Sequence, residues 1–419
     1  MWQEKNAQFA VGARLTRERC QVSGSCPVSY PFEWTPPLEI PEKWRDLRER
    51  PIVEITLPSG DPALLVTRYR DVKALFADVR LSRNTAWYPT SRISLNNNLF
   101  SDPEIDSDPP RYSAERGLVT RAFSARHIEA LRPLAVTITG ELLDRMAEGA
   151  SSAELNEAIA FPLPIRVICH LLGIPEEDME VFRGLVDGFL SISKLPDAEV
   201  ARCREDLWSY IDKFIRLRRE TPGEDLTSAL IQISDGDQNR LSDYQLHHWI
   251  RTLLIAGYIT TASQIGSSMA VLLHRPDVVA DLRADYSLIP SAVEELLRYE
   301  LMGSSLGSLR YALEDIELVD GSVVPKGSTV LLSTEANVDE TAFPDPLTLD
   351  IRRTNNHHLT FGSGIHYCVG AALARMELQV ATEGLLRRFP GLRLAVPAAD
   401  LPRKFGGFLE AFAEIPVEW

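Results

Sequence analysis

The stretch 361–370, FGSGIHYCVG, constrains this 419-residue chain more strongly than any other. Three glycines surround Cys368, and a helix is predicted directly after them, over 371–389. Apolar residues in that segment recur with the spacing of a buried helical stripe, at Ala374, Leu378, Ala381 and Leu385. Glycine permits a left-handed backbone and a close approach to it. The pattern therefore predicts a tight loop that places Cys368 at the N-terminus of a helix.

Three roles for Cys368 are consistent with this position. The free N–H groups and the positive dipole end of a helix favour a thiolate, which is a good iron ligand. A second role is that of a buried structural cysteine, the ordinary role of a lone Cys after a turn. A third is a zinc site shared with His357, His358 and His366, although zinc sites usually show paired ligand spacings and this stretch has only His-x-Cys.

The complete pattern Phe-Gly-x-Gly-x-His-x-Cys-x-Gly resembles the haem-binding loop of the cytochromes P-450. The resemblance implies that Cys368 is the proximal ligand of the haem iron and that Phe361 shields its sulfur. It also implies that His366 reaches a haem propionate and that Gly362 and Gly370 belong to the same cofactor-binding loop.

The length fits two or three domains or one large domain, and the resemblance favours the latter. It implies a mainly α cytochrome P-450 fold with a smaller β portion, spanning residues 38–419. Residues 1–37 mix charged and polar side chains with scattered Cys and Pro, so we expect a poorly ordered or loosely draped lead-in. Hairpins are predicted across Pro58–Asp61, at Asp320–Gly321 and over 405–417.

Charge and cysteine content limit the classes of function. The 44 basic and 59 acidic residues give a formal charge of −15, which disfavours nucleic acid as a partner. The five cysteines are few and unpatterned, as is typical of a reducing cytoplasm. No apolar run reaches the roughly 18 residues of a membrane span, and no secretory signal is evident. Within the resembled family, these features indicate the soluble bacterial type.

A helix is predicted to begin at Asp108-Pro109-Pro110, because Pro suits a first turn and Asp suits a cap. In the resembled family a haem-facing helix begins Asp-Pro-Pro-x-His-Thr, with an Arg four residues after the His. Arg116 matches that Arg, whereas Tyr112 and Ser113 stand where His and Thr are usual. The resemblance implies that Arg116 pairs with a haem propionate, to which the Tyr112 hydroxyl is a second donor. The alternative is a solvated helix face.

A long, central apolar helix is predicted after Ser242–Gln245, which has the signature of a capping box. Its middle, 256–261, reads AGYITT and resembles the family's oxygen-activating Ala-Gly-x-(Asp or Glu)-Thr. The resemblance implies that Ala256 and Gly257 border the haem and that Thr260 helps to hold and protonate dioxygen. The alternative for Thr260 is a core threonine bonded to its own helix.

The acid of that motif is missing, because Ile259 stands in its place. An isoleucine cannot relay a proton. Three explanations stay open: water with Thr260 or Thr261 carries the protons, the substrate itself assists, or the reaction ends in oxidative coupling and needs fewer delivered protons.

Glu295 and Arg298 lie three residues apart on a predicted helix and face the same way. They form either a surface pair or, by resemblance, the family's structural Glu-x-x-Arg, locked to a second arginine. Arg353 is that second arginine, in a segment that resembles Phe-Asp-Pro-x-Arg. Arg310 fits a propionate-binding position in the family, and His358 is either a structural donor or a haem contact.

The resemblance implies that residues 182–193 form the roof of the substrate pocket, and the irregular segment 86–107 and the C-terminal turn are further candidates for its lining. Aromatic rings and an Asn run in segment 86–107 favour a ring-bearing polar molecule. The candidate lining residues are Trp87, Tyr88, Phe189, Ile259, Phe405 and Phe408.

The resemblance implies haem b as cofactor, O2 as co-substrate, and electrons that come ultimately from NAD(P)H through a separate ferredoxin and its reductase. We expect a cytoplasmic monooxygenase that tailors a small bacterial natural product, without a membrane partner. Arg375, Arg387 and Arg388 are candidates for docking the ferredoxin, the alternative being ordinary solvated arginines. Two other functions stay open: oxidative C–C or C–N coupling of an aromatic molecule, such as a cyclic dipeptide, and non-catalytic haem binding.

Overall fold

The structure is a computed structural model. It describes residues 28–32, 37–41, 43–88, 90–93, 102, 104–123, 125–148, 151–191, 195–236, 241–299, 308–404 and 411–419.

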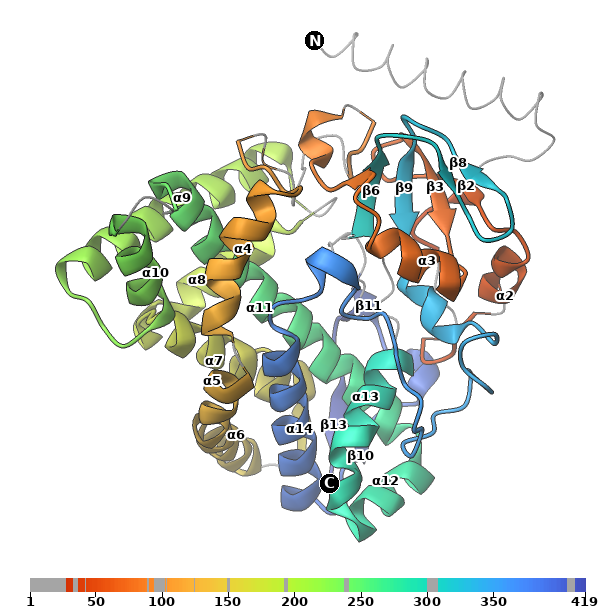
Figure 1. Ribbon diagram of the computed structural model, residues 1–419. Helices are drawn as coiled ribbons and strands as arrows, with labels where there is room; N and C mark the ends of the chain where they lie inside the picture. Colours follow the sequence, from red (N-terminus) through yellow and green to blue (C-terminus); the bar gives the residue numbers. More distant parts are fainter. Residues whose placement is uncertain are drawn as a thin grey trace.

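Helices make up most of the described chain (Figure 1). In chain order they are α2 (Lys43–Arg48), α3 (Tyr69–Phe76), α4 (Arg111–Ala122), α5 (Ala125–Ala130), α6 (Arg132–Ala147), α7 (Pro162–Leu172), α8 (Met179–Phe189), α9 (Asp197–Glu220), α10 (Leu226–Asp235), α11 (Asp243–Leu273), α12 (Pro276–Ala284), α13 (Ile289–Tyr299) and α14 (Ala371–Arg388).

The strands are short. They are β1 (Val28–Ser29), β2 (Val53–Thr56), β3 (Pro62–Val66), β4 (Leu81–Ser82), β5 (Ser152–Glu154), β6 (Leu309–Ala312), β7 (Ile316–Glu317), β8 (Val323–Val324), β9 (Thr329–Leu332), β10 (Arg393–Leu394), β11 (Arg403–Lys404), β12 (Ala411–Phe412) and β13 (Pro416–Glu418). The largest sheet has the order β1-β2-β3-β9-β6-β4 and lies to one side of the helical body (Figure 1). The predicted fold, mainly α with a smaller β portion, is confirmed.

Local sequence signals explain the main elements. The capping box is confirmed at the start of α11: Gln245 N donates to Ser242 Oγ, and Ser242 N donates to Gln245 Oε1. Strands β2 and β3 form the predicted antiparallel hairpin, with Val53 opposite Leu65. Residues of β9 are buried on both faces of the sheet, and β9 is an interior strand between β3 and β6.

Helix α11 runs through the centre of the helical body and organises the core (Figure 1). It is buried almost all round, as its apolar sequence predicts. Helices α7, α9 and α14 pack against it, and α14 also packs on α6 and α13. Because the loop 361–370 leads directly into α14, this packing positions the cysteine loop beside the centre of the molecule.

Three sequence-based expectations differ from the structure. Val28 and Ser29 lie within the predicted loose lead-in but form β1, which pairs in parallel with β2. The predicted C-terminal hairpin has other bounds: β11 pairs with β12 in antiparallel fashion, with Arg403 opposite Phe412, whereas β13 lies between β10 and β5. Asp108 does not cap α4 with its side chain, since its carboxylate accepts hydrogen bonds from Ser82 Oγ and Asn84 Nδ2.

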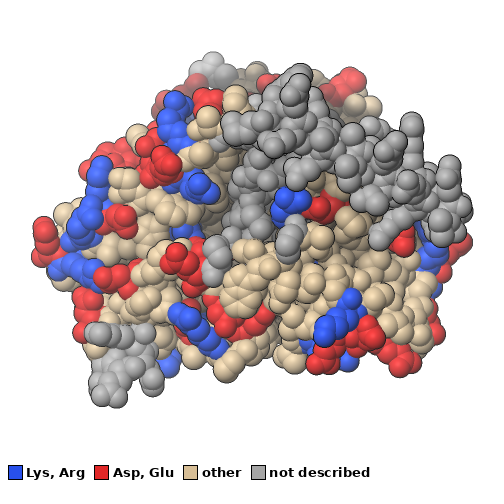
Figure 2. Space-filling view, turned by 90° about the horizontal axis from the view of Figure 1, so that it is seen from above, with Lys and Arg blue, Asp and Glu red and all other residues tan. Residues whose placement is uncertain are grey.

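Among the described residues, no helix is long and apolar enough to cross a membrane. Figure 2 shows basic and acidic side chains interspersed over the described part of the face seen from above.

Candidate active site

Two glycines shape the cysteine loop. Gly362 and Gly364 have φ values of +70° and +69°, in the left-handed region that glycine adopts readily. A side chain does not fit at Gly364, because a Cβ atom would lie 2.8 Å from the carbonyl oxygen of Phe76. The Cys368 amide donates to the Phe361 carbonyl oxygen at 2.9 Å, which closes the loop just before α14.

Cys368 keeps free surface although its thiol lies deep in the protein. Burial raises the pKa of this thiol, while the Gly370 N–H and the charge of Arg116 act in the opposite direction. Ala256 is likewise exposed, although it lies in the middle of the buried helix α11. Interior side chains with free surface border a hollow, so both residues face space that a ligand can occupy.

Positive charge gathers beside the cysteine loop. Arg83 Nη1 lies 3.5 Å from His366 Nδ1. Burial, followed by the charges of Arg83, Arg310 and Arg116, lowers the pKa of His366 to about 2. Burial and the surrounding guanidinium groups therefore keep this imidazole neutral.

Arg310 is buried without an ion-pair partner among the described residues. Its side chain is 4% exposed, and Nη1 donates to the neighbouring Leu309 carbonyl oxygen at 2.8 Å. Burial and the nearby charge of Arg83 lower the pKa of Arg310 to about 9. The Asp108 carboxylate acts in the opposite direction but is held by other hydrogen bonds. A buried cation of this kind is costly unless an anion joins it.

Helix α4 contributes Tyr112 and Arg116 to the same region. Arg116 Nη1 donates to the Tyr112 hydroxyl at 2.9 Å, and Nη2 donates to the Tyr367 carbonyl oxygen. The Tyr112 ring lies 4.5 Å from the His366 ring, centroid to centroid. The structure thus brings Arg116, Tyr112, Arg310 and His366 together, as the sequence predicts, and adds Arg83.

The centre of α11 carries the hydroxyl groups expected near the reaction. Thr260 Oγ1 donates to the Ala256 carbonyl oxygen at 2.6 Å, the helix-internal bond of the alternative interpretation. Its oxygen lone pairs remain able to accept a hydrogen bond from water. Gly257 is partly buried, and an added Cβ would lie 2.9 Å from the terminal methyl of Ile168 on α7, so close helix packing also favours a small residue here. Thr261 is buried in the core.

Glu295 is the centre of a buried ion network. Arg298 Nη2 and Nε lie 2.7 and 2.8 Å from its two carboxylate oxygens, and Arg353 Nε lies 3.1 Å from Oε2. The side chains of Glu295 and Arg298 are fully buried. Asn356 and the Asp350 amide also donate to this carboxylate. The network joins α13 to the chain just before the cysteine loop.

A second carboxylate, that of Glu294, contacts side chains on both sides of the cysteine loop in the sequence. Arg375 and His358 contact it at 2.6 and 3.2 Å. Burial raises the pKa of Glu294, but the hydrogen bonds from His358 and Arg375 outweigh that effect and lower it to about 2. Arg375 also lies over the Phe361 ring, with the guanidinium carbon 4.5 Å from the ring centroid. His358 is accordingly a structural partner of Glu294.

The proposed docking arginines are all engaged within the chain. Arg375 pairs with Glu294, Arg387 with Glu383, and Arg388 with Asp144. They are not free cations, although pairs at the surface exchange partners at little cost.

The residues considered for zinc have separate partners. His358 bonds Glu294, whereas His366 lies beside Arg83. Within the described ranges, no three His, Cys, Asp or Glu side chains are grouped as a metal site requires.

The predicted pocket residues do not all lie together. Ile259 lines a cavity of about 630 Å³ between α8, α9 and α11. Tyr88 stacks on Tyr311, Trp87 is 49% exposed, and Phe189 packs in the core. Outside the described residues lie Phe405 and Phe408.

Comparisons with known proteins agree with this geometry. The Cytochrome P450 family model matches residues 189–404. Nocardicin C N-oxygenase of Nocardia uniformis subsp. tsuyamanensis is 42% identical over 402 residues, covering 93% of this chain and 98% of the relative. Mycinamicin IV hydroxylase/epoxidase of Micromonospora griseorubida is 40% identical over 398 residues, covering 94% and 99%. The crystal structure of SgvP, assigned as a thioether synthase in the tailoring step of griseoviridin, has a TM-score of 0.88 at 41% identity and covers 94% of this chain and 100% of that chain.

The chain therefore belongs to the cytochrome P450 family and is an oxidoreductase of the monooxygenase class. Its cofactor is haem b, its co-substrate is O2, and the electrons come ultimately from NAD(P)H. The residues present fit this group. A thiol with free surface suits an iron ligand, and the cluster of the buried Arg310 with the half-buried Arg83 and Arg116 suits the two haem propionates.

Sequence reasoning missed Arg83. It follows β4 in an irregular segment, and no motif marks it. Only the pairing of β4 with β6 brings it near Arg310, so no local signal predicts its role.

Proposed function

We propose that this enzyme oxidises a small bacterial natural product in the cytoplasm, with electrons delivered by a separate ferredoxin and its reductase. The observation that carries the site assignment is the Arg310 guanidinium, which is buried beside His366 and the cysteine loop without an ion-pair partner among the described residues. Two relatives are named for their action on nocardicin C and mycinamicin IV, and these names support a small natural product as the substrate class.

Each residue of the site has a role in this proposal. Cys368 ligates the iron, and the Gly370 N–H stabilises its sulfur as a thiolate. Arg310, Arg116 and His366 hold the propionates. The bound haem supplies reductive activation of O2, which the thiolate ligand favours.

Proton delivery depends on side chains other than Ile259. Thr260 carries a hydroxyl that exchanges a proton with water, and its bond to the Ala256 carbonyl oxygen fixes its position on α11. Thr261 is buried and lies on a different face of the helix. We therefore assign the proton-carrying hydroxyl to Thr260, with water as its source.

Titration of the ferric holoenzyme with a library of bacterial small molecules tests the substrate class. We expect a saturable shift of the Soret band with one chemical class, followed by product when NAD(P)H, ferredoxin and reductase are supplied. A ligand that shifts the band but never yields product with competent redox partners would contradict the assignment.

Oxidative coupling is a second candidate. The absence of an acid at Ile259 favours it, and so does the similarity to SgvP, whose assigned reaction forms a thioether. Product analysis after turnover with isotopically labelled dioxygen separates the two reactions. Label in the product supports oxygen insertion, and product without label supports coupling.

A further inference from the structure

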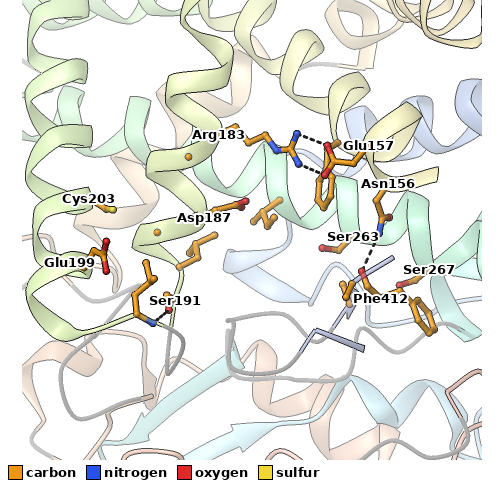
Figure 3. A pocket seen from close by; sticks show the side chains of 18 residues that line it. Asn156, Glu157, Arg183, Asp187, Ser191, Glu199, Cys203, Ser263, Ser267 and Phe412 are labelled. Atoms are coloured by element: carbon orange, nitrogen blue, oxygen red, sulfur yellow. Dashed lines mark hydrogen bonds and ion pairs between the residues drawn. The ribbon is translucent and has the colours of Figure 1, made fainter. Parts of the chain in front are cut away.

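The cavity lined by Ile259 has an unusual charge distribution. It lies between α8, α9 and α11, with β12 at one end, and its volume of about 630 Å³ suits a small organic ligand (Figure 3). Charged groups in its lining are three carboxylates and one guanidinium: Glu157, Asp187, Glu199 and Arg183.

The guanidinium group of Arg183 already has an ion-pair partner. Arg183 makes a bidentate ion pair with Glu157, with N–O distances of 2.8 and 2.5 Å (Figure 3). Its guanidinium carbon also lies 4.8 Å from the centroid of the Phe161 ring. Arg183 therefore offers little to an anionic ligand.

Asp187 has no ion-pair partner among the described residues, although its charge acts on Arg183, one turn earlier on α8. Its carboxylate makes no hydrogen bond or ion pair within the described residues, and it points from α8 toward the middle of the cavity (Figure 3). The Tyr258 phenol, on α11, lies near enough to Asp187 for its pKa to depend on that charge. Burial, and next the charge of Asp187, raises the pKa of the Tyr258 phenol, and its hydroxyl has no partner among the described residues. The charge of Arg183 acts on this phenol in the opposite direction but more weakly than Asp187, and Glu157 and Glu180 act in the same direction as Asp187.

The backbone of α8 leaves room beside Asp187. Gly184 lines the cavity, and a Cβ atom there would meet nothing within 4 Å. Glycine weakens a helix interior, so this position adds space and no stability. Ser263, with its hydroxyl, and Ile259 and Phe412, with apolar surface, complete the walls.

We propose that this cavity binds the ammonium group of an organic cation, with Asp187 as its counter-ion and the ligand body against Ile259 and Phe412. The inference rests on the proposed function and narrows it: the substrate carries an amine or a quaternary ammonium. A carboxylate or phosphate ligand would face Asp187 without a free cation to receive it.

The test uses the ferric holoenzyme and two matched probes. One is tyramine with a trimethylammonium group in place of its amine, and the other is its isostere with a tert-butyl group there. The quaternary nitrogen has no lone pair, so it cannot ligate iron. Calorimetry reports binding, the Soret band reports contact near the haem, and the reduced CO spectrum reports whether haem and thiolate are in place.

We expect the cation to bind more tightly than its isostere, and Asp187→Asn to weaken cation binding about tenfold with little effect on the isostere. Asp206→Asn removes the same charge from an exposed position on α9 and is expected to leave binding unchanged. Gly184→Leu fills the cavity and should weaken both probes.

Equal affinity for cation and isostere, or equal effects of Asp187→Asn and Asp206→Asn, would overturn the site. Cation binding that depends on Asp187 but leaves the Soret band unchanged would support the site and overturn its assignment as the substrate position. Absence of a haem-thiolate CO spectrum would defeat the proposed function independently of the calorimetric result.

Discussion

Removing the charge of Glu295 tests how the ion network supports the fold. Glu295→Gln keeps the shape of the side chain but leaves Arg298 and Arg353 without a counter-charge. The Arg298 side chain is fully buried and that of Arg353 is 9% exposed, so water cannot replace the carboxylate. Loss of one partner from a buried ion pair costs about 3–5 kcal/mol.

The expected change in melting temperature follows from this free-energy cost and the unfolding entropy. Unfolding entropy scales with length, and for 419 residues it is about 0.9 kcal/mol/K. A loss of about 4 kcal/mol therefore lowers Tm by about 4–5 °C.

Thermal unfolding of the holoenzyme measures this effect against a control. Glu383→Gln breaks the Arg387 pair on α14, whose side chains are 43% and 55% exposed, and we expect at most about 0.5 kcal/mol from it. If Glu295→Gln destabilises the protein no more than Glu383→Gln, the network does not support the fold as described.

Three further predictions concern the site and the core. Arg310→Met should accelerate haem transfer to apomyoglobin several-fold, because a propionate loses its buried cation; an unchanged transfer rate would contradict that role. Glu377 is fully buried without a partner for either oxygen among the described residues, and burial raises its pKa well above the usual value. Its folded pKa exceeds its unfolded pKa, so it lowers stability as pH rises above the unfolded value; Glu377→Gln should stabilise the protein by about 2 kcal/mol at neutral pH and by nothing in acid, as denaturant titrations at both pH values will show. Ile259→Asp should lower the peroxide released per NAD(P)H consumed, since it supplies a proton donor beside Thr260; unchanged release would exclude proton supply as the limiting factor.

The sequence predicts the parts of the site that local motifs encode. The loop around Cys368 needs glycine at 364, because Phe76 leaves no room for a Cβ atom, and this requirement is visible as a pattern. The capping box of α11 and the three-residue spacing of Glu295 and Arg298 are local in the same sense.

What the sequence does not predict comes from long-range packing. Arg83 reaches His366 across 283 positions of the chain, and nothing near Arg83 indicates this. In the sequence, Asp187 is an ordinary acidic residue of a helix. Its place in the cavity lining follows only from the packing of α8 beside α11. Phe189 is a pocket candidate in the sequence because it is apolar near a helix end; in the structure it is buried in the core and is not among the residues that line the cavity beside Ile259.

The most direct test of the account is the CO-difference spectrum of the reduced protein, recorded for the wild type and for Cys368→Ser. We predict the red-shifted Soret band of a thiolate-ligated haem in the wild type and its loss in the variant, with haem still bound through the cation cluster around Arg310. The same band in Cys368→Ser, or its absence from the haem-loaded wild type, would contradict the assignment of Cys368 as the iron ligand.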